Sequence, residues 1–113
     1  MTYLSSNQLK QYEDQGYISP IEVLSSSEAL EARKEIELIE KKMPNEIDNA
    51  GRYNVHLISP KLDSIVHNSK ILDAVESIIG NNILVCSTTL FIKNPTEQGF
   101  VSYHQDAKYI GLE

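Results

Sequence analysis

The sequence of 113 residues has one cysteine, no tryptophan, fewer basic than acidic residues, and no long apolar run. The single cysteine, Cys86, excludes a disulfide within the chain and suits a reducing compartment. The formal net charge of −6 argues against a nucleic-acid partner, because phosphates are bound by clustered lysines and arginines. The most apolar segment, residues 83–86, is too short to span a bilayer, and the polar N-terminus does not resemble a signal peptide. We therefore expect a cytoplasmic protein with neither a nucleic-acid nor a membrane partner.

Helix signals dominate about the first 80 residues. Ser5 with Gln8, and Ser25 with Glu28, have the spacing of capping boxes and predict two helix starts. Gly16 predicts the end of the first helix. The second helix has apolar residues at alternating steps of three and four, which predicts a buried stripe. This stripe consists of Ala29, Ala32, Ile36, Ile39 and Met43.

Two further helical features complete this part of the chain. The first helix should bury Leu9 and Tyr12. Ser59 as a cap, with Pro60 at the first helical position, predicts another helical region that ends at Gly80.

Strand signals occur mainly in the second part of the chain. Residues 82–93 are rich in β-branched and aromatic side chains, and residues 52–59 and 100–106 alternate between apolar and polar types. So few strands do not close a sheet. We expect an α+β fold in which helices in about residues 1–80 lead into the first core strands, in about residues 82–113. The whole of residues 1–113 would then be the N-terminal fragment of a single domain.

The strongest candidate for a reactive or metal-binding site in the sequence is a His-x-Asp pair, His104 and Asp106. On a strand, residues i and i+2 point to the same face, so the imidazole and the carboxylate would converge. Together they would supply two of the three ligands in a 2-His-1-carboxylate iron site. The pattern is short and also arises by chance, so the alternative is a surface histidine and aspartate near a strand end.

The chain resembles the phytanoyl-CoA dioxygenase family of iron(II)/2-oxoglutarate oxygenases over most of its length. The opening "LSSNQLKQYEDQGYI" is similar to the family's first helix and its exit. The stretch "HLISPKLDSIVHNSKILDAVESIIGNNI" is similar to the helical region before the first long strand. "FIKNP" followed by "YHQDAKYIGL" is similar to the iron-binding region, and this is the most specific match.

The resemblance implies a double-stranded β-helix of the jelly-roll or cupin type, with His104 and Asp106 as the first two iron ligands. It also implies that iron(II), 2-oxoglutarate and dioxygen are used to hydroxylate a small organic substrate, while 2-oxoglutarate is decarboxylated to succinate. Lys93 could contact the 2-oxoglutarate carboxylate, although a solvated lysine at a strand end is the alternative.

The sequence departs from the family pattern after Asp106. The family's second histidine and its carboxylate-binding arginine lie well downstream of the His-x-Asp motif, and the seven residues that follow here contain neither type. His56 and His67 precede the motif, and we expect both to be structural. The isolated chain should therefore be inactive as an oxygenase.

Other classes of function stay open at this point. A short sheet with open edges recruits further strands, so the chain could be a non-catalytic interaction module that associates with itself through those edges. It could also be a truncated, inactive fragment. The substrate of an oxygenase is not readable from these residues.

Overall fold

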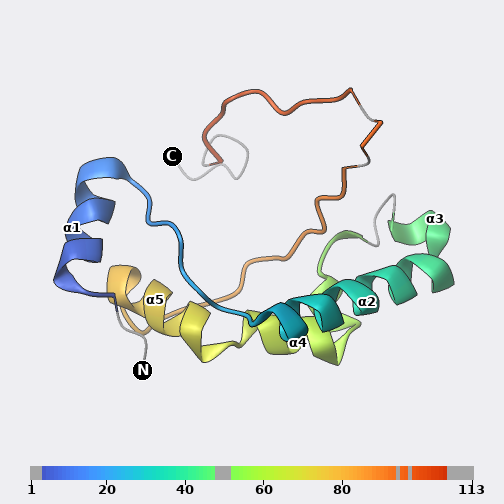
Figure 1. The fold of residues 1–113 in the computed structure, drawn as a ribbon, viewed down its shortest axis with the longest axis horizontal. Coiled ribbons are helices and arrows are strands. Elements are labelled where there is room, and N and C mark those ends of the chain that lie inside the picture. The colour runs from blue at the N-terminus through green and yellow to red at the C-terminus, as the bar shows by residue number, and fades with distance from the viewer. Residues whose placement is uncertain (1–3, 48–51, 94, 97, 107–113) are drawn as a thin grey trace.

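The computed structural model describes residues 4–47, 52–93, 95–96 and 98–106. Figure 1 shows helices followed by a long extended segment. In chain order the described elements are α1 (Ser6–Gln15), α2 (Ser26–Lys42), α3 (Pro44–Ile47), the 3₁₀-helix η2 (Val55–Leu57), α4 (Pro60–Val66) and α5 (Ser69–Ile79). Within these residues, no helix combines the length and apolarity that crossing a bilayer requires.

The helix ends follow the local sequence signals, and these predictions are confirmed. The Ser5 hydroxyl accepts from the Gln8 amide while the Gln8 side chain accepts from the Ser5 amide. Ser25 and Glu28 form the same reciprocal pair at the start of α2. Gly16 ends α1 with a φ of 79°, a left-handed conformation that favours glycine.

The start of α4 and the end of α5 were also predicted correctly. The Ser59 hydroxyl caps the Leu62 amide at 3.3 Å, and Pro60 occupies the first turn of α4. Gly80 ends α5. A short break at residues 67 and 68, where Asn68 caps the start of α5, divides the predicted helical region in two.

The core lies where α2, η2 and α4 meet. Ile39, Val55 and Leu62 are buried together. Ile36, Ile65 and Leu90 are partly buried and pack against them. Ser59 reinforces this junction, because its hydroxyl donates to the Glu35 carboxylate of α2 at 2.8 Å.

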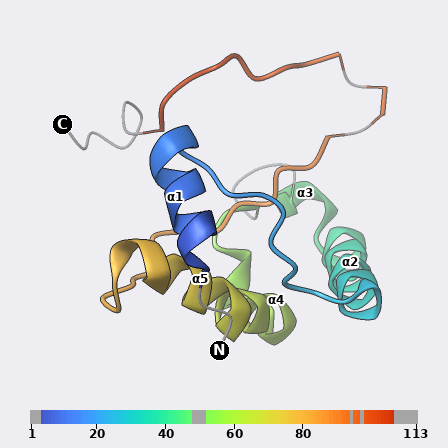
Figure 2. The same ribbon diagram turned by 60° about the vertical axis from the view of Figure 1, so that its left-hand side comes forward.

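The predicted apolar stripe of α2 is only partly buried. Ala32 and Ile39 are buried and Ile36 is half-buried, whereas Ala29 and Met43 are exposed. In α1 the prediction of burial is only partly correct: Leu9 is half-buried, but Tyr12 is exposed. Among the described elements no other helix packs closely against α1, and Figure 2 shows it well apart from α2.

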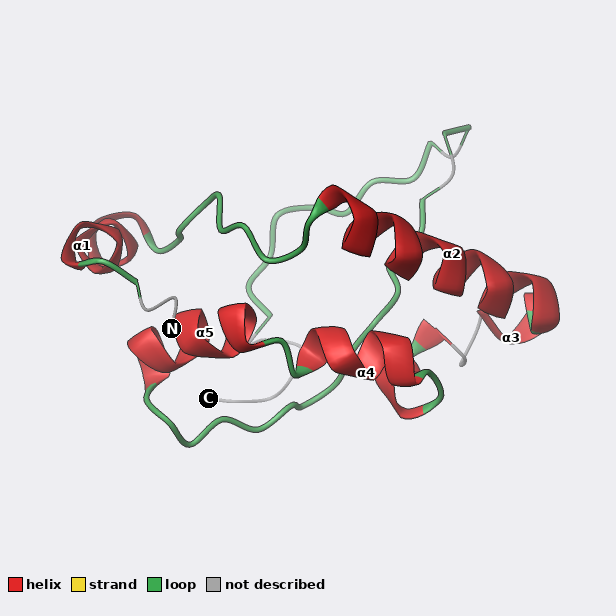
Figure 3. Cartoon of the chain, turned by 60° about the horizontal axis from the view of Figure 1, so that its bottom comes forward, coloured by secondary structure: helices red, strands yellow, loops and turns green. Residues whose placement is uncertain are grey.

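The predicted α+β class, with the first strands of a double-stranded β-helix, is wrong for the described residues. No strand occurs in them, and Figure 3 draws the whole of residues 82–93 as loop. The only sheet-like contact found there is an isolated antiparallel bridge between Tyr53 and Thr89. Residues 55–57, predicted to continue a strand, form η2 instead.

The physical reason is a missing neighbour. A strand forms when its backbone groups pair with an adjacent chain, whatever its residue types. Asn54 has a left-handed backbone with φ 55° and turns the chain into η2, so the pairing with residues 88–90 ends after one bridge. Residues 100–106, also predicted as a strand, have no pairing neighbour among the residues that the structure describes.

The consequence is an unusually large surface. The solvent-accessible area is 9379 Å², whereas a compact monomer of 12.7 kDa exposes about 6200 Å². Much of the excess comes from the extended segment, which arches away from the helices in Figures 1 and 2. Most of its large apolar side chains are exposed, among them Leu84, Phe91, Phe100, Val101 and Tyr103.

Candidate functional site

The His104–Asp106 pair lies in the extended segment, at the start of a turn rather than on a strand. The imidazole Nε2 of His104 is 3.1 Å from Oδ1 of Asp106. The predicted convergence of the two side chains is therefore confirmed, although the strand geometry that motivated it is wrong. Side-chain exposure is 34% for His104 and 81% for Asp106, so a ligand can reach the pair from solvent.

The histidine ring is oriented by a backbone group. Its Nδ1 lies 2.8 Å from the carbonyl oxygen of Ser102. Because a carbonyl only accepts hydrogen bonds, Nδ1 carries the proton in this contact. The other ring nitrogen, Nε2, faces the Asp106 carboxylate. A backbone carbonyl bound to the other ring nitrogen is the usual support of a metal-binding histidine.

Lys93 is exposed and lines a cavity to which the His104–Asp106 pair does not contribute. It borders a hollow of about 260 Å³ together with Phe91, Ile92, Gly99, Phe100 and Val101. Neither His104 nor Asp106 is among these lining residues. The structure thus does not bring the two parts of the sequence-predicted site into one described cavity.

His56 and His67 each have a structural hydrogen bond, in the role that we expected from the sequence. The Nδ1 of His56 lies 2.7 Å from the Thr88 hydroxyl and ties η2 to the extended segment. The Nδ1 of His67 lies 3.1 Å from the carbonyl oxygen of Asp63 and 3.3 Å from its carboxylate. Across the described ranges, no group of three or more His, Cys, Asp or Glu side chains could hold a metal ion.

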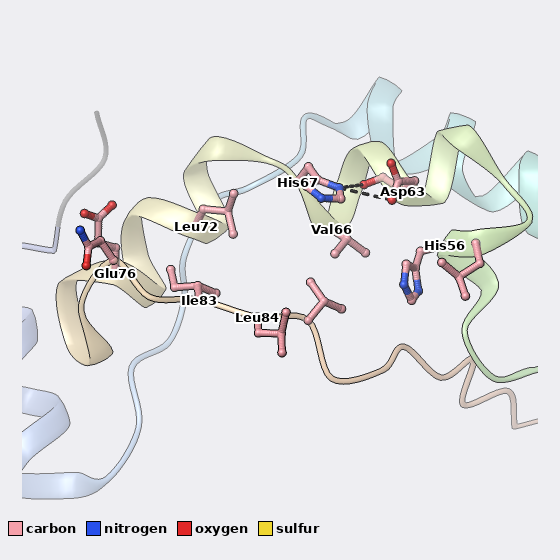
Figure 4. Close-up of a pocket in the computed structure, with 11 residues that line it drawn as sticks. His56, Asp63, Val66, His67, Leu72, Glu76, Ile83 and Leu84 are labelled. Carbon is pink, nitrogen blue, oxygen red and sulfur yellow. Dashed lines mark hydrogen bonds and ion pairs between the residues drawn. The ribbon is translucent and has the colours of Figure 1, made fainter.

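A groove along α4 and α5 was not predicted from the sequence. It has a volume of about 560 Å³, and its lining includes Val66 and Leu72 on the helices and Ile83 and Leu84 on the extended segment. Figure 4 shows these side chains facing a common space, with the Asp63–His67 pair on one wall and His56 at one end. The apolar residues of α4 and α5 were recognisable in the sequence, but which of them face residues 83–85 depends on the path of the chain after Gly80.

Comparison with protein-family models, with curated proteins and with solved structures finds no match for this chain. The functional argument consequently depends on the residues and their geometry. That geometry supplies two candidate ligands for one divalent cation, His104 and Asp106, held at the distance described above.

Proposed function

We propose that the chain is the N-terminal portion of an iron(II)/2-oxoglutarate-dependent oxygenase, in which His104 and Asp106 are two of the three protein ligands. The observation that carries the proposal is the 3.1 Å separation of His104 Nε2 and Asp106 Oδ1. The resemblance of "YHQDAKYIGL" to the iron-binding region of the phytanoyl-CoA dioxygenase family supports the same assignment.

The separation fits two ligands on adjacent positions of one metal ion. Protein nitrogen and oxygen ligands lie about 2.1 Å from a first-row divalent ion. Two such ligands at a right angle are then about 3.0 Å apart, as in the facial arrangement of two histidines and one carboxylate. The observed 3.1 Å agrees with this geometry.

The hydrogen bond between His104 and the Ser102 carbonyl determines which ring nitrogen is available to a metal ion. With Nδ1 donating to the Ser102 carbonyl, the other ring nitrogen, Nε2, faces the Asp106 carboxylate. A cation bound by both groups would lie between them, and this is the role that we assign to the pair.

The chain's own residues then have distinct tasks. The Ser102 carbonyl fixes the ring of His104, and Asp106 supplies the negative charge that an iron(II) ion needs. When bound, the iron and 2-oxoglutarate would supply the oxidising chemistry for hydroxylating a small organic substrate. A third protein ligand and a group for the 2-oxoglutarate carboxylate must come from outside the described residues, and Lys93 is the candidate that this part of the chain offers for the second task.

The direct test is a titration of the purified chain with cobalt(II) as a spectroscopic substitute for iron(II), followed by anaerobic iron(II) binding. We expect weak binding, because two protein ligands hold a divalent ion less firmly than three. His104→Ala and Asp106→Ala should each abolish it.

The matched control is His67→Ala, because His67 and Asp63 form another solvent-accessible His–Asp pair, at 3.3 Å, at the end of α4. This variant should bind like the parent chain. Binding that is unchanged in His104→Ala would contradict the assignment.

A second test examines the missing ligands. We expect the coding sequence beyond the Glu113 codon to continue with a further histidine and a later arginine. The longer polypeptide should release succinate from 2-oxoglutarate under air, and its His104→Ala variant should not, whereas the 113-residue chain should show no turnover. A stop codon directly after Glu113, or turnover by the short chain alone, would count against the proposal.

A further inference from the structure

The starting point is an edge of the extended segment at residues 87–91. Asn54 N donates to Thr88 O at 2.7 Å, and Leu90 N donates to Arg52 O at 2.9 Å. These bonds flank the antiparallel bridge between Tyr53 and Thr89. Exposure alternates as on a strand, with Thr88 and Leu90 partly buried. Ser87, Thr89 and Phe91 are exposed. Residues 87–91 therefore have the geometry of a strand that is paired on one side.

The second edge of this segment is open. In an antiparallel ladder, successive residues direct their backbone N–H and C=O groups to opposite edges. Because Thr88 and Leu90 bond to residues 52–54, the N–H and C=O of Thr89 point the other way. In the described part of the chain, neither group of Thr89 forms a backbone hydrogen bond. An edge of this kind is a template for another strand.

The composition of the segment indicates what kind of strand could pair with this open edge. Residues 81–92, "NNILVCSTTLFI", contain no charged residue, no proline and no glycine, although the whole chain has a net charge of −6. Two copies can thus pair through this segment without opposing like charges. A charged peptide would find no complementary charge on it. Its β-branched and aromatic residues are suited to cross-strand packing.

We propose that two copies of the chain associate by antiparallel pairing of residues 87–91 across a twofold axis at Thr89. Thr89 of each copy donates its N–H to the carbonyl oxygen of the other copy's Thr89 and accepts in return. In this register Ser87 lies opposite the second copy's Phe91. The bridge from Tyr53 to Thr89 in each copy is retained, so the paired unit contains four backbone segments, two from each copy. This interface is separate from the proposed iron site, and either proposal can fail without the other.

The test uses disulfide trapping to read the register, in a chain in which Cys86 is replaced by Ser. Thr89→Cys should form a disulfide-linked dimer on mild oxidation, because opposed residues in a hydrogen-bonded pair have Cα atoms about 5.5 Å apart, within disulfide range. Ser87→Cys is the matched control. It is equally exposed, but the two copies' residues 87 would be about 13 Å apart, four residues along a strand. It should stay monomeric under the same conditions.

Sedimentation of the parent chain and of Thr89→Pro gives an independent reading. The parent should sediment as a dimer that dissociates on dilution, and Thr89→Pro should be a monomer with unchanged helix content, because only the outward N–H is removed. Equal trapping at positions 87 and 89 would mean unspecific aggregation and overturn the proposal. A monomeric parent would also overturn it, and protection of the Thr89 amide from hydrogen exchange in that monomer would assign the edge to another segment of the same polypeptide.

Discussion

Ile39 and Leu84 are both aliphatic residues in apolar stretches, yet Ile39 is 8% exposed and Leu84 is 92% exposed. The first belongs to the helical region and the second to the extended segment of residues 82–106. A helix satisfies its backbone hydrogen bonds within itself and needs a neighbour only for one apolar face. An extended segment needs a neighbour for both its backbone and its side chains. The helices of this chain therefore form with few contacts from the extended segment, whereas most of that segment has no described neighbour to pair with.

The largest change in stability that tests this comparison should come from placing a charge in the core. Ile39→Asp should lower the free energy of unfolding by about 3 kcal/mol or more, since it places an unpaired carboxylate among Val55 and Leu62. Thermal unfolding followed by circular dichroism measures it. Phe100→Asp, in the extended segment at 87% exposure, should leave the melting temperature nearly unchanged. Equal loss in both variants would show that the extended segment is part of the cooperative core.

The next effect concerns the buried junction between α2 and α4. Ser59 is 2% exposed and both caps α4 and donates to Glu35. Ser59→Ala should cost about 1–2 kcal/mol in a urea titration, because it removes a helix cap and leaves a carboxylate oxygen without its donor. The control is Ser64→Ala, an exposed serine on the same helix whose hydroxyl donates to the Lys61 carbonyl of its own helix. That variant should change stability by less than about 0.5 kcal/mol.

A smaller effect should come from the contact that joins the two regions. His56→Ala and Thr88→Val each remove the 2.7 Å hydrogen bond between η2 and the extended segment. In a double-mutant cycle we expect a coupling of about 1 kcal/mol or less. Hydrogen exchange of the Leu90 amide, which bonds to Arg52, should accelerate in both single variants. An unchanged exchange rate would show that the backbone bonds hold the segment without this side-chain contact.

The smallest effect concerns the capping box of α2 and depends on pH. Hydrogen bonds from the Ser25 hydroxyl and amide lower the pKa of Glu28 from its ordinary value of 4.5. A lowered pKa in the folded state means that ionised Glu28 adds stability at pH values above 4.5. This contribution is lost as the pH falls through the folded-state value. The stability difference between the parent chain and Glu28→Gln should be present at pH 7 and shrink on acidification. A difference that does not depend on pH would rule out ionisation as its cause.

The sequence predictions were correct for the helix starts and wrong for the strands. Helix starts at Ser5, Ser25 and Ser59 were predicted correctly, because a cap is formed by residues three positions apart. Strands at residues 52–59, 82–93 and 100–106 were predicted wrongly, because their formation depends on a partner whose presence no local pattern reveals. Asn54 ends the pairing of residues 52–54 with residues 88–90, because asparagine tolerates the left-handed conformation that turns the chain into η2.

For the candidate site, the sequence predicted proximity but not its cause. His104 and Asp106 converge, as residues i and i+2 would on a strand, but here the segment is not a strand and the His104 ring is held by the Ser102 carbonyl. The groove along α4 and α5 and the His56–Thr88 contact were not predicted, because both join residues far apart in the chain. Their partners are selected by tertiary packing, which spacing alone does not encode.

Leu90 has a consequence for the order of folding. It packs against the cluster of Ile39, Val55 and Leu62 but follows all three in the chain, so it leaves the ribosome after them. The helices that precede it depend mostly on near neighbours in sequence, and such contacts form quickly. During synthesis the nascent chain would thus present an assembled helical layer with one vacant position, and the arrival of residues 88–90 would close it.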